Sequence, residues 1–374
     1  MRRILILMGR YLPGHKDGGP LRTIINVTDA LGDEYEFYIA CLDRDHGDEK
    51  PYPNIKLGEW NTIGKAKVWY VPPHGFTKKL ILELSKKVDL IYTCGFYDDY
   101  GYKTLLLKKT GKLKEKPVVV ASMGSFSKGA LAQKALKKKL FISLLKIFGL
   151  FKNITWSVTS ELEANDLKRV ISKKAKYIIA EDLPRSNVPG IGNRDLNEKS
   201  IVFLSRICPK KNLLGAIRAV SGLKIEAKFD IYGPKEDVDY WNICEVELNK
   251  LPNNINWQYK GDVPSEEVQC VLQKYNVFLF PTLGENYGHV IFEALSVGCV
   301  PIISDQTPWN VIQEKPAGYI LPLSEDMYDY TETLSNYFFE PLEKKELLAE
   351  NAIHIAMSKV ESVKEDTGYR KIFK

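Results

Sequence analysis

The stretch that decides the fold runs from Val277 to Asn310 and reads VFLFPTLGENYGHVIFEALSVGCVPIISDQTPWN. Its first apolar run, Val277–Phe280, ends at a proline and a glycine-containing turn, and a helical pattern begins at about Gly288. A second apolar run, Val300–Ser304, follows the helix. Short apolar runs that alternate with helices are typical of parallel sheets covered by helices on both faces. The stretch is therefore predicted to form a strand–helix–strand unit of a doubly wound α/β domain.

The same alternation continues on both sides of this stretch. Helical patterns such as Leu21–Leu31, Lys78–Lys86 and Tyr100–Lys109 fall between most of the apolar runs. Residues 183–198 carry two prolines and two glycines without apolar periodicity, so we interpret them as a linker. The other expected strands are Ile4–Met8, Glu36–Cys41, Lys67–Val71, Asp89–Cys94, Val118–Met123, Ile154–Thr159 and Tyr177–Ala180 before the linker, and Ser200–Leu204, Phe229–Tyr232, Ile255–Gln258 and Tyr319–Leu321 after it.

A length of 374 residues favours two domains over one. We place the first at residues 1–182 and the second at residues 199–358, and we predict a Rossmann-like, doubly wound parallel sheet in each. Open α/β sheets bind ligands at the carboxyl ends of their strands. We therefore expect one cleft lined by loops of both domains.

The composition is that of a globular protein with a mildly basic balance. The net charge is +6 and charged residues make up 27%, which does not indicate a dedicated nucleic-acid binder. The six cysteines include no C-x-x-C pair, so we expect free thiols in a reducing, cytoplasmic compartment. The run Ile4–Met8 is too short for the core of a signal peptide. No run approaches the roughly 18 apolar residues of a membrane-spanning helix.

Two glutamates in the opening stretch suggest chemistry at the end of its first strand. Glu285 precedes the predicted helix, and Glu293 lies about two turns inside it. The amides of Asn286, Tyr287 and Gly288 would form a helix start suited to a diphosphate or a sugar. We expect Glu285 to meet the sugar and Glu293 to bind two neighbouring hydroxyls, such as those of a ribose. Glutamates eight residues apart are common in helices, so the spacing alone leaves a purely structural role open.

In this context the segment from Glu285 to Glu293 resembles the E-x7-E motif of the retaining glycosyltransferases in the family glycosyl transferases group 1. Gly288 and the Glu-Ala-Leu that begins at Glu293 also follow the family pattern. The resemblance covers nearly all of residues 199–323 and extends more weakly into the first half. It implies the GT-B fold, in which two Rossmann-like domains face each other across a cleft. It also implies that a C-terminal helix, at about 359–374, packs back on the first domain.

A basic pair follows the first strand of the second domain. Arg206 and Lys211 flank the start of a helix, where a guanidinium fork and an ammonium suit a phosphate. Fixed cations there would stabilise the charge that develops on a departing nucleoside diphosphate. The spacing resembles the family's Arg-x4-Lys clamp, which favours Lys211 over its neighbour Lys210. Two solvated surface cations are the alternative.

Two further loops resemble the nucleotide side of the family's donor site. Each follows a strand and contains a glycine, and the resemblance implies that Gly233 and Val263 lie along the base and ribose through backbone groups. Taken alone, each loop is an ordinary turn. Neither distinguishes a UDP-sugar from a GDP-sugar.

The first strand is joined to the first helix by residues 14–20. This loop lacks the order G-x-G-x-x-G, which disfavours a nicotinamide cofactor. Gly18 and Gly19 precede a proline at the helix start, where an anion can approach closely. The resemblance implies that these glycines contact the donor phosphates, with an ordinary strand–helix turn as the alternative. Met123 stands near a point where many family members carry a histidine, which puts any first-domain histidine contact in doubt.

Two other polar features are ambiguous. His289 stands where the commoner family pattern has an aliphatic residue; it could contact sugar or phosphate, or it could pack or cap the helix. Asp43-Arg-Asp45 is a D-x-D string, which holds a divalent metal in another glycosyltransferase fold. It lies here in a polar loop, so we interpret it as a solvated or acceptor-side loop. We expect no metal ion and no other cofactor.

Residues 128–152 contain seven lysines, no acidic residue and many apolar side chains. A basic amphipathic helix can lie in an anionic membrane interface. This would suit a lipid-linked acceptor and a peripheral position at the inner face of the membrane. A core-facing helix with solvated lysines and a surface for an acidic glycan are the alternatives.

These features predict a metal-independent, retaining hexosyltransferase. It would move a sugar from a UDP-sugar or GDP-sugar to a glycan or lipid-linked glycan acceptor, and Asp305–Trp309 resembles bacterial surface-polysaccharide enzymes. A front-side reaction needs no side-chain base, whereas a double displacement would need Glu285 as nucleophile. The alternatives are a sugar-nucleotide epimerase, a phosphorylase on the same fold, for which no pyridoxal phosphate lysine is found, or a non-catalytic subunit that binds sugar nucleotides.

Overall fold

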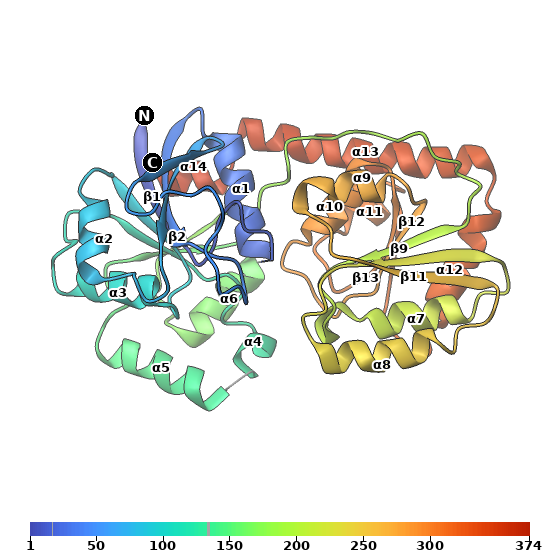
Figure 1. Cartoon of the computed structure of the whole chain (residues 1–374), viewed down its shortest axis with the longest axis horizontal. Helices are drawn as coiled ribbons and strands as arrows, with labels where there is room; N and C mark the ends of the chain where they lie inside the picture. Colours follow the sequence, from blue (N-terminus) through green and yellow to red (C-terminus); the bar gives the residue numbers. More distant parts are fainter. Residues whose placement is uncertain (17, 133–134) are drawn as a thin grey trace. The chain divides into compact units, whose positions relative to one another are not determined.

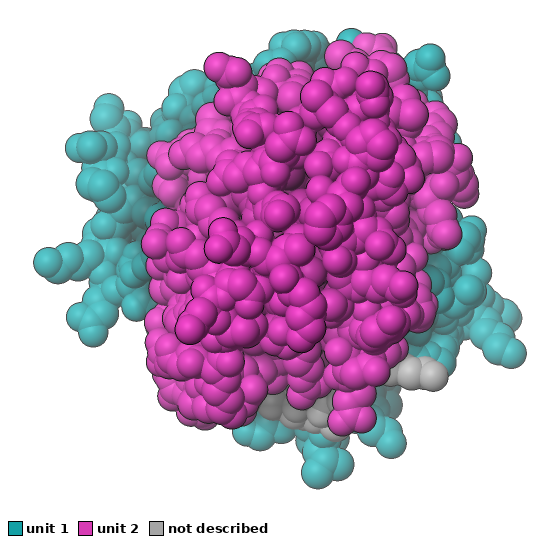
Figure 2. Space-filling view, turned by 90° about the vertical axis from the view of Figure 1, so that its right-hand side faces the viewer, with its two compact units in different colours: residues 1–183, 363–374 teal, residues 184–362 magenta. Residues whose placement is uncertain are grey.

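The computed structural model describes residues 1–16, 18–132 and 135–374, which form two compact units (Figures 1 and 2). Unit 1 comprises Met1–Leu183 and Val363–Lys374, and unit 2 comprises Pro184–Ser362. Asp17 of the expected glycine loop and Gln133–Lys134 of the basic segment lie outside the described residues.

Unit 1 is built on a sheet in the order β3-β4-β2-β1-β5-β6-β7-β8. All neighbouring strands are parallel except β3 and β4, which form an antiparallel edge. The seven predicted strands are confirmed. The edge strand β3 was not predicted, because its four half-exposed residues show no clear apolar alternation. The strands are β1 (Arg2–Leu7), β2 (Tyr35–Leu42), β3 (Trp60–Ile63), β4 (Ala66–Val71), β5 (Leu90–Cys94), β6 (Val118–Ala121), β7 (Thr155–Val158) and β8 (Tyr177–Ile179).

Helices cover both faces of this sheet (Figure 1). Side chains of successive strand residues point to opposite faces, so Ile4 and Ile6 join a core with α1 and α14, whereas Leu5 and Leu7 join a core with α2, α3, α5 and α6. This is the arrangement predicted from the β–α alternation. The helices are α1 (Gly19–Leu31), α2 (Lys78–Ser85), α3 (Asp99–Lys109), α4 (Lys128–Ala132), α5 (Ala135–Ile147), α6 (Glu161–Val170) and α14 (Gly368–Phe373).

Unit 2 is built on an all-parallel sheet in the order β11-β10-β9-β12-β13-β14. All six predicted strands are confirmed. They are β9 (Ser200–Leu204), β10 (Ala227–Tyr232), β11 (Ile255–Gly261), β12 (Val277–Phe280), β13 (Val300–Ser304) and β14 (Tyr319–Leu321). The helices are α7 (Leu213–Ser221), α8 (Val238–Leu248), α9 (Val268–Leu272), α10 (His289–Ser296), α11 (Val311–Glu314), α12 (Tyr328–Phe339) and α13 (Leu342–Glu365).

The segment interpreted as a linker contains no helix or strand, and residues 184–198 pack on unit 2. Arg194 donates to the Asn276 side chain at 3.0 Å and to the Val297 carbonyl at 2.9 Å. Gln269 donates to the Asn187 carbonyl at 3.0 Å. Buried polar groups need partners, and Arg194 supplies them to the residue before β12 and to the residue after α10.

Both sheets have a point where the order of strands reverses. In unit 1 it lies between β1 and β5, and in unit 2 between β9 and β12. Loops on the two sides of such a point run to opposite faces, which leaves a crevice at the carboxyl ends of the strands. These two points are where functional side chains are expected to gather.

No described helix has the length and apolarity needed to cross a bilayer. All six cysteines are free; four of them are buried, and Cys270 is exposed.

Stability should depend on the ionisation of Asp182. Burial raises the pKa of Asp182 to about 7, although the Thr23 hydroxyl donates to this carboxyl at 2.9 Å and acts in the opposite direction. Between about pH 4 and 7 the folded chain holds a proton that the unfolded chain has released, so the free energy of unfolding falls as pH rises. We expect the free energy of unfolding to fall by about 1–3 kcal/mol over this pH range. The fall is smaller than for a fully buried carboxyl, because Asp182 is partly exposed.

Asp182→Asn should remove this pH-dependent term. The difference in melting temperature between variant and wild type should shift in favour of the variant from pH 5 to pH 8. The exposed Asp33→Asn is the control. An equal difference at both pH values would show that Asp182 is ionised in the folded chain throughout.

Candidate functional site

The clearest site residues lie at the strand-order reversal of unit 2. Lys211 follows β9 and Glu285 follows β12, and their Nζ and Oε1 atoms are 2.6 Å apart. Their side chains are only 13% and 10% exposed. The ammonium also lies 5.5 Å from the centre of the Phe280 ring. Residues 74 positions apart therefore form a nearly buried ion pair, because β9 and β12 are adjacent parallel strands.

The turn after β12 is fastened to the loop after β9. The Lys210 carbonyl accepts from the Leu283 amide at 2.9 Å and from the Thr282 hydroxyl at 3.2 Å. The hydroxyl of Thr282 also lies 3.0 Å from Oε1 of Glu285. The Glu285 amide donates to the Gln306 carbonyl at 3.0 Å. Backbone and side chain of Glu285 are thus both held, which fixes its carboxylate beside Lys211.

Helix α10 begins one residue later than predicted. Gly288 is its N-cap, with φ of 81°, and His289 is its first residue. A Cβ at Gly288 would lie 2.8 Å from the Cδ1 atom of Ile291, so both conformation and space favour glycine here. The first amides of a helix have no partner within the helix and can bind an anion. The expected anion site at this turn is therefore shifted toward His289 and Val290.

The side chains around this helix start differ in role. Asn286 is exposed, whereas Tyr287 is buried between His289 and Trp309, with ring centres 4.8 and 5.4 Å away. The indole N–H of Trp309 donates to the Tyr287 carbonyl. His289 is half-buried and contacts Tyr287, so it has a packing role whatever else it contacts. No sequence pattern indicated that Trp309 supports this turn.

Arg206 lies in the same loop as Lys211 but contacts a different acid. Its guanidinium pairs with Glu236, and both side chains are about 40% exposed. Gly233, three residues before Glu236, has φ of 126°, and a Cβ there would lie 1.9 Å from the Ser205 carbonyl oxygen. The loops after β9 and β10 therefore touch, and their contact presents Arg206 at the carboxyl edge of the sheet.

The loop after β11 continues this edge. The Gly233 amide donates to the Gly261 carbonyl at 2.9 Å, and Val263 is partly buried against the core of unit 2. Five loops, those after β9, β10, β11, β12 and β13, thus form one continuous rim. All the donor-site residues predicted in the second half except Glu293 lie on it.

Glu293 lies inside α10, buried, with Oε1 at 4.0 Å from a terminal nitrogen of Arg185. That nitrogen also donates to the Ser265 carbonyl at 2.8 Å. Arg185 precedes β9 in a segment that was interpreted only as a linker, so sequence reasoning missed it. A ribose bound by Glu293 would have to share this carboxylate with Arg185.

Unit 1 has a cavity of about 220 Å³ at its own strand-order reversal. Residues after β1, β5 and β6 line it, together with the start of α1, and include Arg10, Asp98 and Ser125. Met123 also lines it and adopts φ of 48°. Met123 was marked by the family pattern, whereas Arg10 and Asp98 belong to no motif and were not predicted.

The glycine loop of unit 1 is held by an aspartate. Asp45 is buried, and its Oδ2 accepts from the amides of His15 and Lys16 at 2.8 and 3.2 Å. Burial acts to raise the pKa of Asp45, but these amides and that of His46 hold it below its ordinary value. Asp43-Arg-Asp45 is therefore not a solvated loop, because both aspartates are buried, and the acceptor-side interpretation stays a prediction.

Gly18 is the N-cap of α1, and a Cβ at Gly19 would meet no atom within 4 Å. There is thus room beside the helix start. Nowhere in the described ranges do three or more His, Cys, Asp or Glu side chains group as metal ligands.

Residues 185–354 match the model of the family described as glycosyl transferases group 1. Two curated relatives are GDP-mannose:cellobiosyl-diphosphopolyprenol alpha-mannosyltransferases. That of Xanthomonas oryzae pv. oryzae (strain PXO99A) is 24% identical over 248 residues, and that of Xanthomonas campestris is 23% identical over 236 residues. The alignments cover 64% and 61% of this chain and 62% and 59% of the relatives. The chain thus spans less than two thirds of the curated relatives' length.

Solved structures resemble the whole chain. Sucrose-phosphate synthase from Thermosynechococcus elongatus superposes with a TM-score of 0.73 at 15% sequence identity. The superposition covers 100% of this chain and 99% of the synthase chain. Anabaena HepE, in complex with UDP and glucose, has a TM-score of 0.70 at 15% identity, covering 98% of each chain. At this identity the likeness establishes the fold, and the predicted GT-B fold is confirmed.

The Lys211–Glu285 pair should be strongly coupled. Lys211→Met leaves a nearly buried carboxylate without its cation, so we expect a loss of about 2 kcal/mol in unfolding free energy. The double variant with Glu285→Gln should recover part of this loss, giving a coupling of about 1–2 kcal/mol in urea denaturation.

Arg206→Met is the matched control, since its exposed pair with Glu236 should contribute less than about 1 kcal/mol. Additive losses at Lys211 and Glu285 would mean that the two side chains do not interact in solution.

Proposed function

Residues 185–354 belong to the family glycosyl transferases group 1, and from this premise we propose that the chain transfers a sugar from a nucleoside-diphosphate sugar to a glycan or lipid-linked glycan acceptor. We propose retention of the anomeric configuration, no metal requirement, and a UDP-sugar or GDP-sugar as donor. The observation that carries the proposal is the Lys211–Glu285 pair at the strand-order reversal of unit 2.

The pair suits a leaving group that gains negative charge. Lys211 is held in place by the Glu285 carboxylate, and a diphosphate at the start of α10 would compete with Glu285 for its ammonium. A cation positioned before the reaction needs no reorganisation as the bond to the sugar breaks, so it favours the transition state. Arg206 can add a second contact on exchanging Glu236 for phosphate.

Glu285 then has two possible functions in the same place. In a front-side reaction the departing phosphate takes the acceptor proton, and Glu285 positions Lys211 and contacts the sugar. In a double displacement its carboxylate would attack the anomeric carbon. Its two contacts, from Lys211 and Thr282, both use Oε1. We propose the front-side role, because both contacts hold the Glu285 carboxylate beside Lys211 and because this route needs no side-chain base.

The acceptor is proposed from the relatives and from unit 1. The names of the two mannosyltransferases specify GDP-mannose and a cellobiosyl-diphosphopolyprenol. A diphosphate-linked lipid of that kind would bring the chain to a membrane surface, in keeping with the proposed cytoplasmic, peripheral location and a role in bacterial surface-polysaccharide synthesis. We propose that the 220 Å³ cavity of unit 1 binds part of the acceptor.

Donor binding can be tested without an acceptor. UDP, GDP and their sugar esters are titrated, and the compounds of one of the two bases should raise the melting temperature. At a ligand concentration of about 100 times the dissociation constant, the free energy of unfolding should rise by about 2.7 kcal/mol. Lys211→Met should lose most of this stabilisation. Lys210→Met is the control, since only its carbonyl is engaged at the turn. No response to either nucleotide would contradict the proposal.

Catalysis is separated from binding at Glu285. Glu285→Gln releases Lys211 from a negative charge, so nucleoside diphosphate affinity should be unchanged or higher. Slow hydrolysis of the donor should nevertheless fall by about 10²–10³-fold. Hydrolysis at the wild-type rate would leave Glu285 a structural residue, and absence of hydrolysis and transfer in the wild type would favour a sugar-nucleotide-binding subunit.

A further inference from the structure

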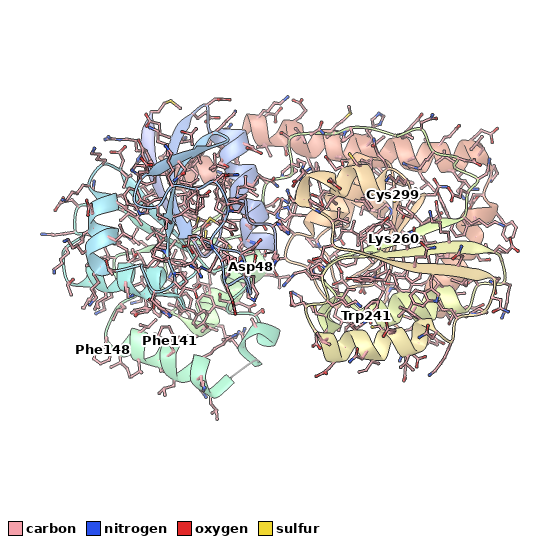
Figure 3. The ribbon with its side chains drawn as sticks, viewed as in Figure 1. Asp48, Phe141, Phe148, Trp241, Lys260 and Cys299 are labelled. Carbon is pink, nitrogen blue, oxygen red and sulfur yellow. The ribbon has the colours of Figure 1, made fainter. Side chains whose placement is uncertain are left out.

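Helix α5 exposes an unusual apolar surface. Leu136, Leu140, Leu144, Ile147 and Phe148 are 85%, 63%, 43%, 78% and 64% exposed. Their spacing places them within about one third of the helix circumference. The opposite side carries Ile142 and Leu145, which are buried in the core of unit 1. In Figure 1 the helix lies at the lower margin of unit 1, and Figure 3 labels Phe148 at its end.

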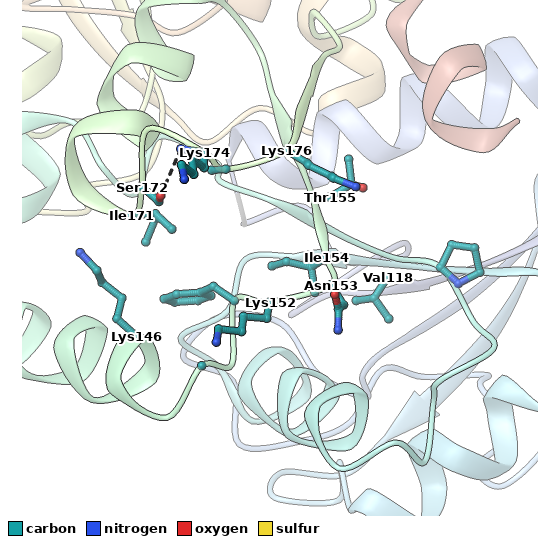
Figure 4. Close-up of a pocket in the computed structure, with 14 residues that line it drawn as sticks. Val118, Lys146, Lys152, Asn153, Ile154, Thr155, Ile171, Ser172, Lys174 and Lys176 are labelled. Carbon is teal, nitrogen blue, oxygen red and sulfur yellow. Dashed lines mark hydrogen bonds between the residues drawn. The ribbon is translucent and has the colours of Figure 1, made fainter.

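A basic cavity adjoins the end of this helix (Figure 4). It has a volume of about 690 Å³, and its lining includes Lys146, Lys152, Lys174 and Lys176. Among the residues that the structure describes, no acidic side chain lines it. Lys146 lies on the side of α5 away from the stripe, where its ammonium donates to the Val170 carbonyl at 2.9 Å. Gly149, which directly follows Phe148 of the stripe, also lines the cavity, so the stripe ends at the cavity's edge.

The sheet explains why these lysines gather. The loops that lead into β6, β7 and β8 enter three adjacent parallel strands, so they meet at the amino edge of the sheet. The proposed transfer site uses the carboxyl edges of the sheets, where ligands of such folds bind. The cavity is therefore a separate site, and the transfer reaction does not account for it.

The chemistry of the cavity identifies its ligand class. Four ammonium groups around one hollow repel one another unless an anion lies among them. Asn153, Thr155 and Ser172 add polar groups, and Phe151, Ile154 and Ile171 add an apolar floor. A phosphate joined to an apolar body fits this combination better than a free inorganic anion does.

We propose that this surface binds anionic phospholipid: the stripe of α5 enters the membrane interface, and the lysine cavity holds a lipid headgroup phosphate. The proposal deepens the proposed function, because it names what would hold the enzyme at the membrane of a lipid-linked acceptor. Charge complementarity carries it, since each lysine near an anionic surface contributes favourably to binding and an apolar stripe alone would not distinguish neutral from anionic lipid.

The test is cosedimentation of the full chain with vesicles. Wild type should bind vesicles of phosphatidylcholine mixed with phosphatidylglycerol at least about tenfold more tightly than vesicles of phosphatidylcholine alone. The triple variant Lys152→Gln, Lys174→Gln, Lys176→Gln should lose about tenfold or more of this affinity. Ile147→Asp should weaken binding to both kinds of vesicle.

A matched control removes the same charge from unit 2, by Lys224→Gln, Lys274→Gln and Lys315→Gln, and should bind like wild type. Equal losses in the two triple variants, or equal binding to both kinds of vesicle, would overturn the proposal. So would retention on immobilised heparin without vesicle binding, which would assign the surface to an acidic glycan. Vesicle binding needs no sugar donor, so the two proposals can fail separately. Loss of vesicle binding with intact sugar transfer contradicts only the membrane proposal, and loss of transfer with intact vesicle binding contradicts only the proposed function.

Discussion

The adjacency of β9 and β12 is the constraint on which the rest of the site depends. Because these parallel strands are neighbours, the loops that leave them meet, and Lys211 and Glu285 become a nearly buried ion pair. The carbonyl of Lys210 and the hydroxyl of Thr282 fasten the two loops around the pair. A cation and an acid in such a place are costly to desolvate unless each compensates the other. The fold therefore keeps a charged group ready at the helix start of α10 without leaving that charge unopposed.

The two ion pairs allow the cations of the site to change partners when an anionic ligand binds. Arg206 and Lys211 both contact carboxylates of the protein, Glu236 and Glu285, which stand where an anionic ligand would be attracted. Exchange of a carboxylate for a phosphate preserves the neutral balance around each cation. The exposed pair can exchange at little cost, and the buried pair exchanges at the least cost for a ligand that also satisfies Glu285. A sugar with free hydroxyls is such a ligand.

The strands were predictable because their apolar runs are buried on both faces. Family spacing singled out Lys211 and Glu285 as site residues, but it did not predict that they form an ion pair. Other features depend on contacts between segments that carry no motif. The sequence pattern of Arg185 is that of a linker, yet this residue lies 4.0 Å from Glu293. Asp45 lies in a segment whose polar sequence is typical of a solvated loop, yet its side chain is buried and accepts hydrogen bonds from the amides of His15 and Lys16. Arg206 was expected to act with Lys211, but its partner Glu236 comes from a loop fixed by the close approach of Gly233 to Ser205.

We propose that Lys211 exchanges Glu285 for a donor phosphate, and a crystal structure of the chain with its nucleoside-diphosphate sugar bound would test this exchange. A phosphate oxygen should lie within hydrogen-bond distance of the Lys211 ammonium and close to the first amides of α10, with Glu285 turned toward the sugar. A nucleotide bound elsewhere on unit 2, with the Lys211–Glu285 pair intact, would contradict it.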